Sequence, residues 1–139
     1  MKISLIRPEQ ADIHAQLDRL KPAFAGNEDA AQQFARCCHQ VMTRRARFYH
    51  LTGDGVSLRV VGEADGGEYF VSALAGNNLA AGLPVFIDAV ASQGFDTLCG
   101  TAFRKGILRI YERAGFRVTG NCGTAKALCL DLRGKDGTQ

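Results

Sequence analysis

The sequence predicts an α/β (α+β) fold, in which a mixed, mostly antiparallel sheet of six or seven strands is flanked by four helices. Two observations predict it. The spacing of apolar residues alternates between the period of two typical of strands and the period of about 3.6 typical of helices, and turn-forming residues separate the segments. The length of 139 residues suits one core, so we expect a single domain over residues 1–133 and a polar tail over 134–139.

The first third of the chain predicts one strand and two helices. Residues 2–6 alternate apolar and polar side chains, and Pro8 ends this pattern because proline has no N–H for a sheet ladder. Over residues 8–20 the apolar side chains recur every third or fourth position until the next proline, which predicts a helix. Asn27 is a favourable N-cap for a second amphipathic helix that continues to Met42.

The middle of the chain predicts an antiparallel meander. Residues 47–52, 56–62 and 68–74 are rich in β-branched and aromatic residues, as strands are. The glycine-rich stretches 53–55 and 64–67 separate them and favour tight turns. Three consecutive strands joined by two tight turns form a meander.

The last third predicts two helices, each followed by a strand, and a closing strand. Helical spacing with Pro84 near the start and Gly94 after the end indicates the first helix, and Gly115 is placed to cap the second. The expected segments are a helix around 83–90, a strand at 95–101, a helix at 103–114, and strands at 116–119 and 125–132 joined by the polar turn 121–124.

Charge and cysteine content restrict the class of protein. Lys and Arg number 17 and Asp and Glu 14, so the net charge of +3 is too small to indicate a nucleic-acid-binding protein. The aligned residues Lys105, Arg109 and Arg113 are expected to form a solvated helix face. No apolar run could span a bilayer, so we expect a cytoplasmic protein without membrane contact. Five cysteines without C-x-x-C spacing predict reduced thiols and no metal site.

The order of elements and two short stretches resemble the GNAT superfamily of N-acyltransferases. Residues 6–12, Ile-Arg-Pro-Glu-Gln-Ala-Asp, are similar to the first strand-to-helix junction of the family. Residues 110–116, Ile-Tyr-Glu-Arg-Ala-Gly-Phe, are similar to the family signature in its fourth helix. The resemblance implies transfer of an acetyl or other acyl group from acyl-CoA to an amine of a small molecule or a protein.

The resemblance also implies roles for individual residues. Tyr111 corresponds to the tyrosine that protonates the leaving thiolate, although it is equally well explained as part of the helix core. Glu68 is the candidate general base, with Glu63 as the other nearby carboxylate, and each is also explained as a solvated charge at a strand end. The positions that correspond to the acetyl-CoA site are Ser72, Ala73, Leu74, Asn77, Asn78, Ala80, Gly82 and Arg104.

The phosphate-binding loop departs from the family pattern. The family motif, Arg/Gln-x-x-Gly-x-Gly/Ala, is replaced by Asn-Asn-Leu-Ala-Ala-Gly over residues 77–82, and Pro84 removes one N–H donor. Arg104 stands where the family has an asparagine. The alternative hypothesis is therefore a catalytically inactive protein of this fold, similar to short bacteriophage GNAT-like chains, with a structural or host-interaction role in a virion. Either form could be a homodimer or part of a larger assembly, using an exposed sheet edge at 125–132.

Overall fold

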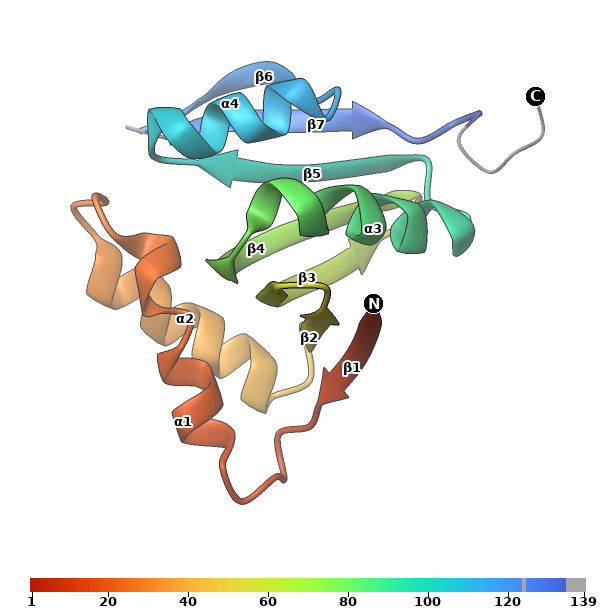
Figure 1. Cartoon of the computed structure of the whole chain (residues 1–139). Helices are drawn as coiled ribbons and strands as arrows, with labels where there is room; N and C mark the ends of the chain where they lie inside the picture. The colour runs from red at the N-terminus through yellow and green to blue at the C-terminus, as the bar shows by residue number, and fades with distance from the viewer. Residues whose placement is uncertain (124, 135–139) are drawn as a thin grey trace.

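The computed structural model describes residues 1–123 and 125–134, which form one seven-stranded sheet and its flanking helices (Figure 1). The elements are β1 (Lys2–Ile6), α1 (Ile13–Asp18), the 3-10 helix η1 (Lys21–Phe24), α2 (Ala30–Met42), β2 (Arg47–Gly53), β3 (Val56–Asp65), β4 (Glu68–Asn77), α3 (Leu79–Ser92), β5 (Thr97–Ala102), α4 (Lys105–Arg113), β6 (Arg117–Cys122) and β7 (Ala125–Asp131). The strand order is β1-β2-β3-β4-β5-β7-β6, and β4 with β5 is the parallel pair.

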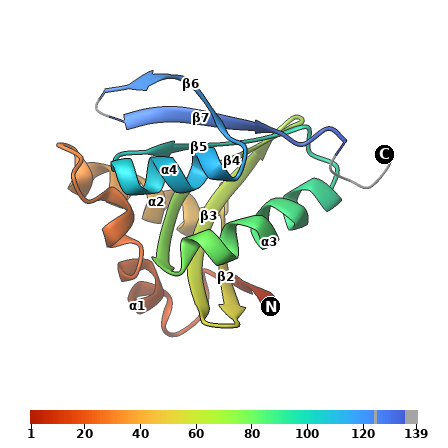
Figure 2. The same ribbon diagram turned by 45° about the horizontal axis from the view of Figure 1, so that its top comes forward.

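Helices cover both faces of the sheet (Figures 1 and 2). One core lies between α3, α4 and the sheet, and includes Leu58, Leu83 and Leu128. The other core lies between α1, η1, α2 and the first strands, and includes Leu20 and Phe48. The alternation of side chains along each strand supplies both cores, since successive residues point to opposite faces. The predicted mixed α/β architecture is therefore confirmed.

The parallel pair β4–β5 is short, and this shapes the centre of the sheet. The two strands pair only over Glu68–Phe70 and Thr97–Cys99. Beyond this point β5 continues beside β7, whereas β4 continues beside β3. The register between β3 and β4 shifts there, so that Ser72 has no partner in β3 and forms a β-bulge. A bulge bends its strand, and it lies where β4 leaves β5.

Several expected boundaries differ from the observed ones. The first helix is one short turn-and-a-half, Ile13–Asp18, because the Arg7 N–H bonds to the Gln10 side chain and the chain turns before it. β4 extends to Asn77, and α3 begins at Leu79 without an intervening loop. Of the expected turn at 121–124, Asn121 and Cys122 belong to β6 and residue 124 lies outside the described residues, as do residues 135–139 of the tail.

Two expectations about the C-terminal strands are wrong. The segment 125–132 is not a sheet edge, because β7 lies between β5 and β6, and β1 and β6 are the edge strands. The cysteines are not all reduced, because Cys99 and Cys129 form a disulfide. These two residues are directly opposed in the β5–β7 register, with Cα atoms 4.1 Å apart. Their separation of 30 residues in sequence gives no sign of this proximity.

Candidate functional site

A narrow slot follows from the separation of β4 and β5, and we call it the β4–β5 slot. It has a volume of about 40 Å³ and opens beside α4. Its lining residues are Val71, Ser72, Ala73 and Leu74 of β4, Thr101, Ala102, Phe103 and Arg104 at the end of β5, Ile107 and Tyr111 of α4, Leu79 of α3, and Ala23 of η1. Of the residues expected to bind acyl-CoA, the structure thus brings together Ser72, Ala73, Leu74 and Arg104.

A larger cavity lies on the opposite face of the sheet, beneath α2, and we call it the α2-side cavity. It has a volume of about 410 Å³. Its lining residues are Phe24, Gln33, Arg36, Cys37, Gln40, Glu63, Phe70, Ser72, Thr101, Phe103, Cys122 and Ala125. Ser72, Thr101 and Phe103 line both this cavity and the β4–β5 slot. The two spaces therefore meet where the strands separate.

Tyr111, on α4, lines the slot. Its side chain is 4% exposed and packs edge-to-face on Phe116, with ring centroids 4.9 Å apart. A β-carbon built on Gly100 would lie 4.0 Å from the Tyr111 hydroxyl and 3.6 Å from the Val71 carbonyl oxygen. Glycine at position 100 thus leaves space beside the hydroxyl. Burial raises the pKa of the Tyr111 phenol above its ordinary value, so the group remains a proton donor at neutral pH.

The two glutamates weighed as general bases occupy different places. Glu68 is the first residue of β4 and pairs with Asp65 at the tip of the β3–β4 hairpin, at the closed end of the β4–β5 pair. Glu63 pairs with Phe70, and its half-buried side chain lines the α2-side cavity. The structure therefore brings Glu63, and not Glu68, to the space that meets the slot.

The start of α3 differs from the glycine-rich loop of the family. Asn78 has a left-handed backbone, with φ of 64°, and its carbonyl accepts the N–H groups of Ala81 and Gly82. Asn77, Asn78 and Ala80 are exposed and line none of the slot, whereas Leu79 and Arg104 line both the slot and a small adjoining pocket of about 80 Å³. None of the expected binding residues of this segment, Asn77, Asn78, Ala80 and Gly82, lines the slot or the adjoining pocket.

Two features of the slot bear on the binding of acyl-CoA. Beyond Phe70, the edge of β4 that faces the slot has no β5 partner, so its backbone groups are available to the amide groups of a pantetheine arm. Leu79, the first residue of α3, and Arg104 line the slot and the adjoining pocket, and a helix N-terminus and a cation both favour a pyrophosphate. The N–H groups of Ala81 and Gly82 already bond to the Asn78 carbonyl. At about 40 Å³ the slot is narrower than a pantetheine arm, so β4 and α4 would have to move apart to admit one.

Gly82 has a packing role that its match to the phosphate-binding motif did not indicate. It is buried in the second turn of α3, where an added β-carbon would lie 2.4 Å from Leu58 Cδ1 and 3.0 Å from Val56 Cγ1. The absence of a side chain lets α3 approach β3 closely. This close approach explains the glycine without a phosphate contact.

Replacing Gly82 with alanine is expected to lower the free energy of unfolding by about 1–3 kcal/mol, because the extra methyl group overpacks the α3–β3 contact. The measurement is urea denaturation at equilibrium. Gly106→Ala in α4 is the matched control, since a β-carbon there meets nothing within 4 Å and a helical glycine-to-alanine change stabilises by roughly 0.5–1 kcal/mol. If G82A were as stable as the unaltered protein, the packing role would be refuted.

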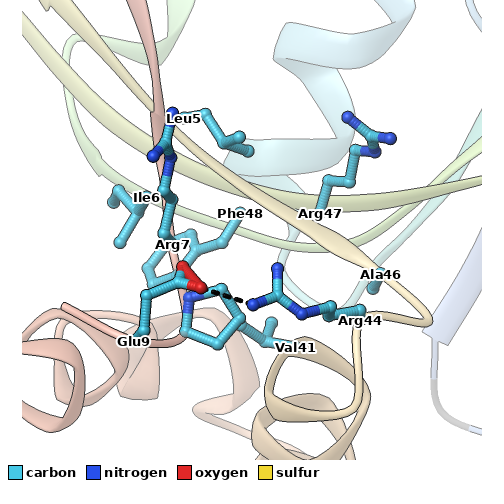
Figure 3. Close-up of a pocket in the computed structure, with 10 residues that line it drawn as sticks. Leu5, Ile6, Arg7, Glu9, Val41, Arg44, Ala46, Arg47 and Phe48 are labelled. Atoms are coloured by element: carbon cyan, nitrogen blue, oxygen red, sulfur yellow. Dashed lines mark hydrogen bonds and ion pairs between the residues drawn. The ribbon is translucent and has the colours of Figure 1, made fainter.

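A third cavity, of about 290 Å³, lies at the other side of the molecule between β1, β2 and the end of α2. Figure 3 shows the Glu9 carboxylate directed at the guanidinium of Arg44, whereas the side chains of Arg7 and Arg47 extend away from this pair. The hydrogen bond from Arg44 lowers the pKa of Glu9, and Arg44 has a left-handed backbone with φ of 63°. This cavity shares no lining residue with the slot or the α2-side cavity.

The described part of the chain holds neither a metal-binding cluster nor a membrane-spanning helix. Within residues 1–123 and 125–134, no group of three or more His, Cys, Asp and Glu side chains is arranged to hold a metal ion. None of the helices in the same ranges has the length and apolar character needed to cross a membrane.

Solved N-acetyltransferases share this architecture. The ribosomal-protein-S18-alanine N-acetyltransferase from Escherichia coli aligns with a TM-score of 0.66 and 19% identity over 94% of this chain and 93% of that chain. The aminoglycoside 6'-acetyltransferase type Ii aligns with a TM-score of 0.65 and 13% identity over 95% of this chain and 97% of that chain. The PaiA N-acetyltransferase from Thermoplasma acidophilum, solved with coenzyme A, aligns with a TM-score of 0.64 and 11% identity over 94% of this chain and 99% of that chain. No protein-family model and no curated protein sequence matches the chain.

The chain therefore has the GNAT N-acetyltransferase fold, and the expectation drawn from the element order is confirmed at the level of the fold. The parallel β4–β5 pair that separates beyond Cys99 is the centre of this architecture.

Proposed function

We propose that the protein is an N-acyltransferase that moves an acetyl or other acyl group from acyl-CoA to an amine. One observation carries the proposal: the β4–β5 slot, which is bordered by α4, and the α2-side cavity share three lining residues, Ser72, Thr101 and Phe103. A cofactor arm in the slot and an acceptor in the cavity would meet at these residues. Tyr111 borders the first space and Glu63 the second.

Acyl-CoA, when bound, supplies the thioester that makes the acyl group transferable. The acceptor nitrogen forms a bond to the acyl carbon, the carbon–sulfur bond breaks, and the sulfur leaves with the bonding electron pair. Glu63 accepts the proton that the amine loses, directly or through a water molecule. The Tyr111 hydroxyl donates a hydrogen bond to the departing sulfur. Its raised pKa favours hydrogen bonding over complete proton transfer to a thiolate.

The proposal is tested by thermal unfolding with and without about 1 mM acetyl-CoA. If this concentration is about 100 times the dissociation constant, binding stabilises the folded state by about 2.7 kcal/mol. For a chain of 139 residues, this stabilisation raises Tm by roughly 8 °C. Equal concentrations of ATP and of inorganic pyrophosphate control for non-specific anion binding. A Tm that no acyl-CoA raises above these controls would remove the basis for the activity.

A second candidate function is a binding role without acyl-CoA, as a structural or host-interaction component. It is favoured by the absence of the glycine-rich loop, since α3 begins directly after β4 and Gly82 is explained by packing. The thermal experiment separates the two candidates. Under the binding role, acetyl-CoA leaves Tm unchanged and the purified chain associates with a larger particle or a protein partner, as sedimentation with candidate particles would show.

A further inference from the structure

The walls of the α2-side cavity carry opposite charges. Arg36 on α2 and Glu63 on β3 are the charged side chains among its lining residues. In the described part of the chain, neither forms an ion pair, and the three ion pairs there involve other residues. Although Arg36 and Glu63 border one cavity, they do not pair with each other within 4.0 Å. Glu63 is half-buried and Arg36 is exposed, so both charges are available to a ligand in the cavity.

The two walls also differ in the residues around each charge. Gln33 and Gln40 flank Arg36 at helical spacings of three and four, so the three residues form a polar strip on one side of α2. The strand side carries Glu63 among aromatic side chains and the hydroxyl residues Ser72 and Thr101. The cavity therefore has a cationic, hydrogen-bonding side on α2 and a side on the sheet that holds one carboxylate.

The two charges lie at different distances from the slot: Glu63 is on the sheet near it, and Arg36 is on α2. Glu63 pairs with Phe70, and Phe70 pairs with Cys99 at the last paired position of β4 and β5. Glu63 is therefore in the same row of the sheet as the point where the slot begins. Arg36 lies on the helix that covers the cavity, away from the sheet.

From this arrangement we infer that the acceptor is a small amine that carries a negatively charged group, with its amine directed at Glu63 and its anionic group at Arg36. The guanidinium of arginine recognises carboxylates and phosphates through paired N–H donors. The volume of about 410 Å³ is within the usual range of small-molecule sites, roughly 300–1,000 Å³. A polyamine would place a second cation against Arg36, and a neutral amine would leave Arg36 without a partner.

The inference rests on the proposed acyltransferase function and is tested by acceptor preference. The assay follows release of the CoA thiol from acetyl-CoA with amines of matched length: propylamine, β-alanine, O-phosphoethanolamine and 1,3-diaminopropane. We expect kcat/KM to be at least about tenfold higher for one of the two anionic amines than for propylamine, mainly through KM. Comparison of β-alanine with O-phosphoethanolamine distinguishes a carboxylate from a phosphate. Longer ω-amino acids are then each compared with the alkylamine of the same length. The chain length with the largest preference indicates the separation between Glu63 and Arg36.

Variants of Arg36 connect the preference to the proposed residue. Arg36→Gln is expected to reduce the ratio of kcat/KM between the preferred anionic amine and propylamine to about one, and Arg36→Glu to shift the preference to 1,3-diaminopropane. The matched control is Arg109→Gln, since Arg109 is exposed on α4 and lines none of the cavities described above, so the ratio should be retained.

The possible failures are distinguishable. If acetyl-CoA does not raise Tm and no amine is acylated, the proposed function fails, and the inference fails with it. If acetyl-CoA binds and amines are acylated with equal kcat/KM, or if Arg36→Gln leaves the ratio unchanged, the acyltransferase function stands and the anionic acceptor is refuted.

Discussion

The variant Tyr111→Phe is expected to lower kcat about 100-fold, while the KM for acetyl-CoA and the thermal stability change little. The substitution removes the hydroxyl near Gly100 and keeps the ring that packs against Phe116. Steady-state kinetics and thermal unfolding measure the two effects. Since burial raises the pKa of Tyr111 above about 10, loss of its proton should not reduce the rate of the unaltered enzyme at any pH below that value.

A second buried tyrosine provides the control. Tyr69 is 8% exposed, packs edge-to-face against Phe86 and Phe95, and has its pKa raised to about 12 by burial. It lines neither the slot nor the α2-side cavity. Tyr69→Phe should therefore retain the full rate. Equal rates for Y111F and the unaltered protein would show that Tyr111 serves the core alone.

The variant Glu63→Gln is expected to lower kcat/KM about 100- to 1,000-fold, because glutamine cannot accept the proton that the amine loses. Glutamine has nearly the same shape, so E63Q should still bind acetyl-CoA. The rise in Tm on addition of acetyl-CoA measures this binding. The preferred amine is assayed over a range of pH, because a deprotonated amine at high pH has less need of a base. We therefore expect the difference between E63Q and the unaltered enzyme to decrease as pH rises.

Glu68→Gln is the matched control for this prediction. Glu68 lies at the hairpin tip opposite Asp65 and lines neither the slot nor the α2-side cavity. Its substitution should leave kcat/KM within about twofold, as expected for a surface change away from the site. If E68Q lost activity and E63Q kept it, the assignment of the base would have to be reversed.

The sequence predicted the succession of strands and helices because each depends on a local pattern. The strand 47–52, for example, is recognised from its own apolar residues and the glycines after it, and it appears as β2 (Arg47–Gly53). Tyr111 could be anticipated in the same way, since it belongs to the apolar stripe of a clearly amphipathic helix.

The choice between Glu63 and Glu68 could not be made from local pattern, because it depends on pairing between strands. The β3–β4 hairpin places Glu68 opposite Asp65 at its tip and Glu63 opposite Phe70. The bulge at Ser72 and the end of the β4–β5 pairing then fix where the slot opens. Both features arise from register, which no short window of residues specifies. The position of Arg36 at the α2-side cavity could not be predicted for the same reason, since only the packing of α2 brings Arg36 over the sheet.

The bond between Cys99 and Cys129 closes a covalent ring in the chain. The ring contains the end of β5, all of α4 and β6, and most of β7, and it therefore includes Tyr111 and Arg104. If a protease cut the backbone once anywhere within this ring, the two pieces would stay joined until the disulfide was reduced. The residues that border the slot from this side are thus tethered to the sheet twice, once through the backbone and once through sulfur.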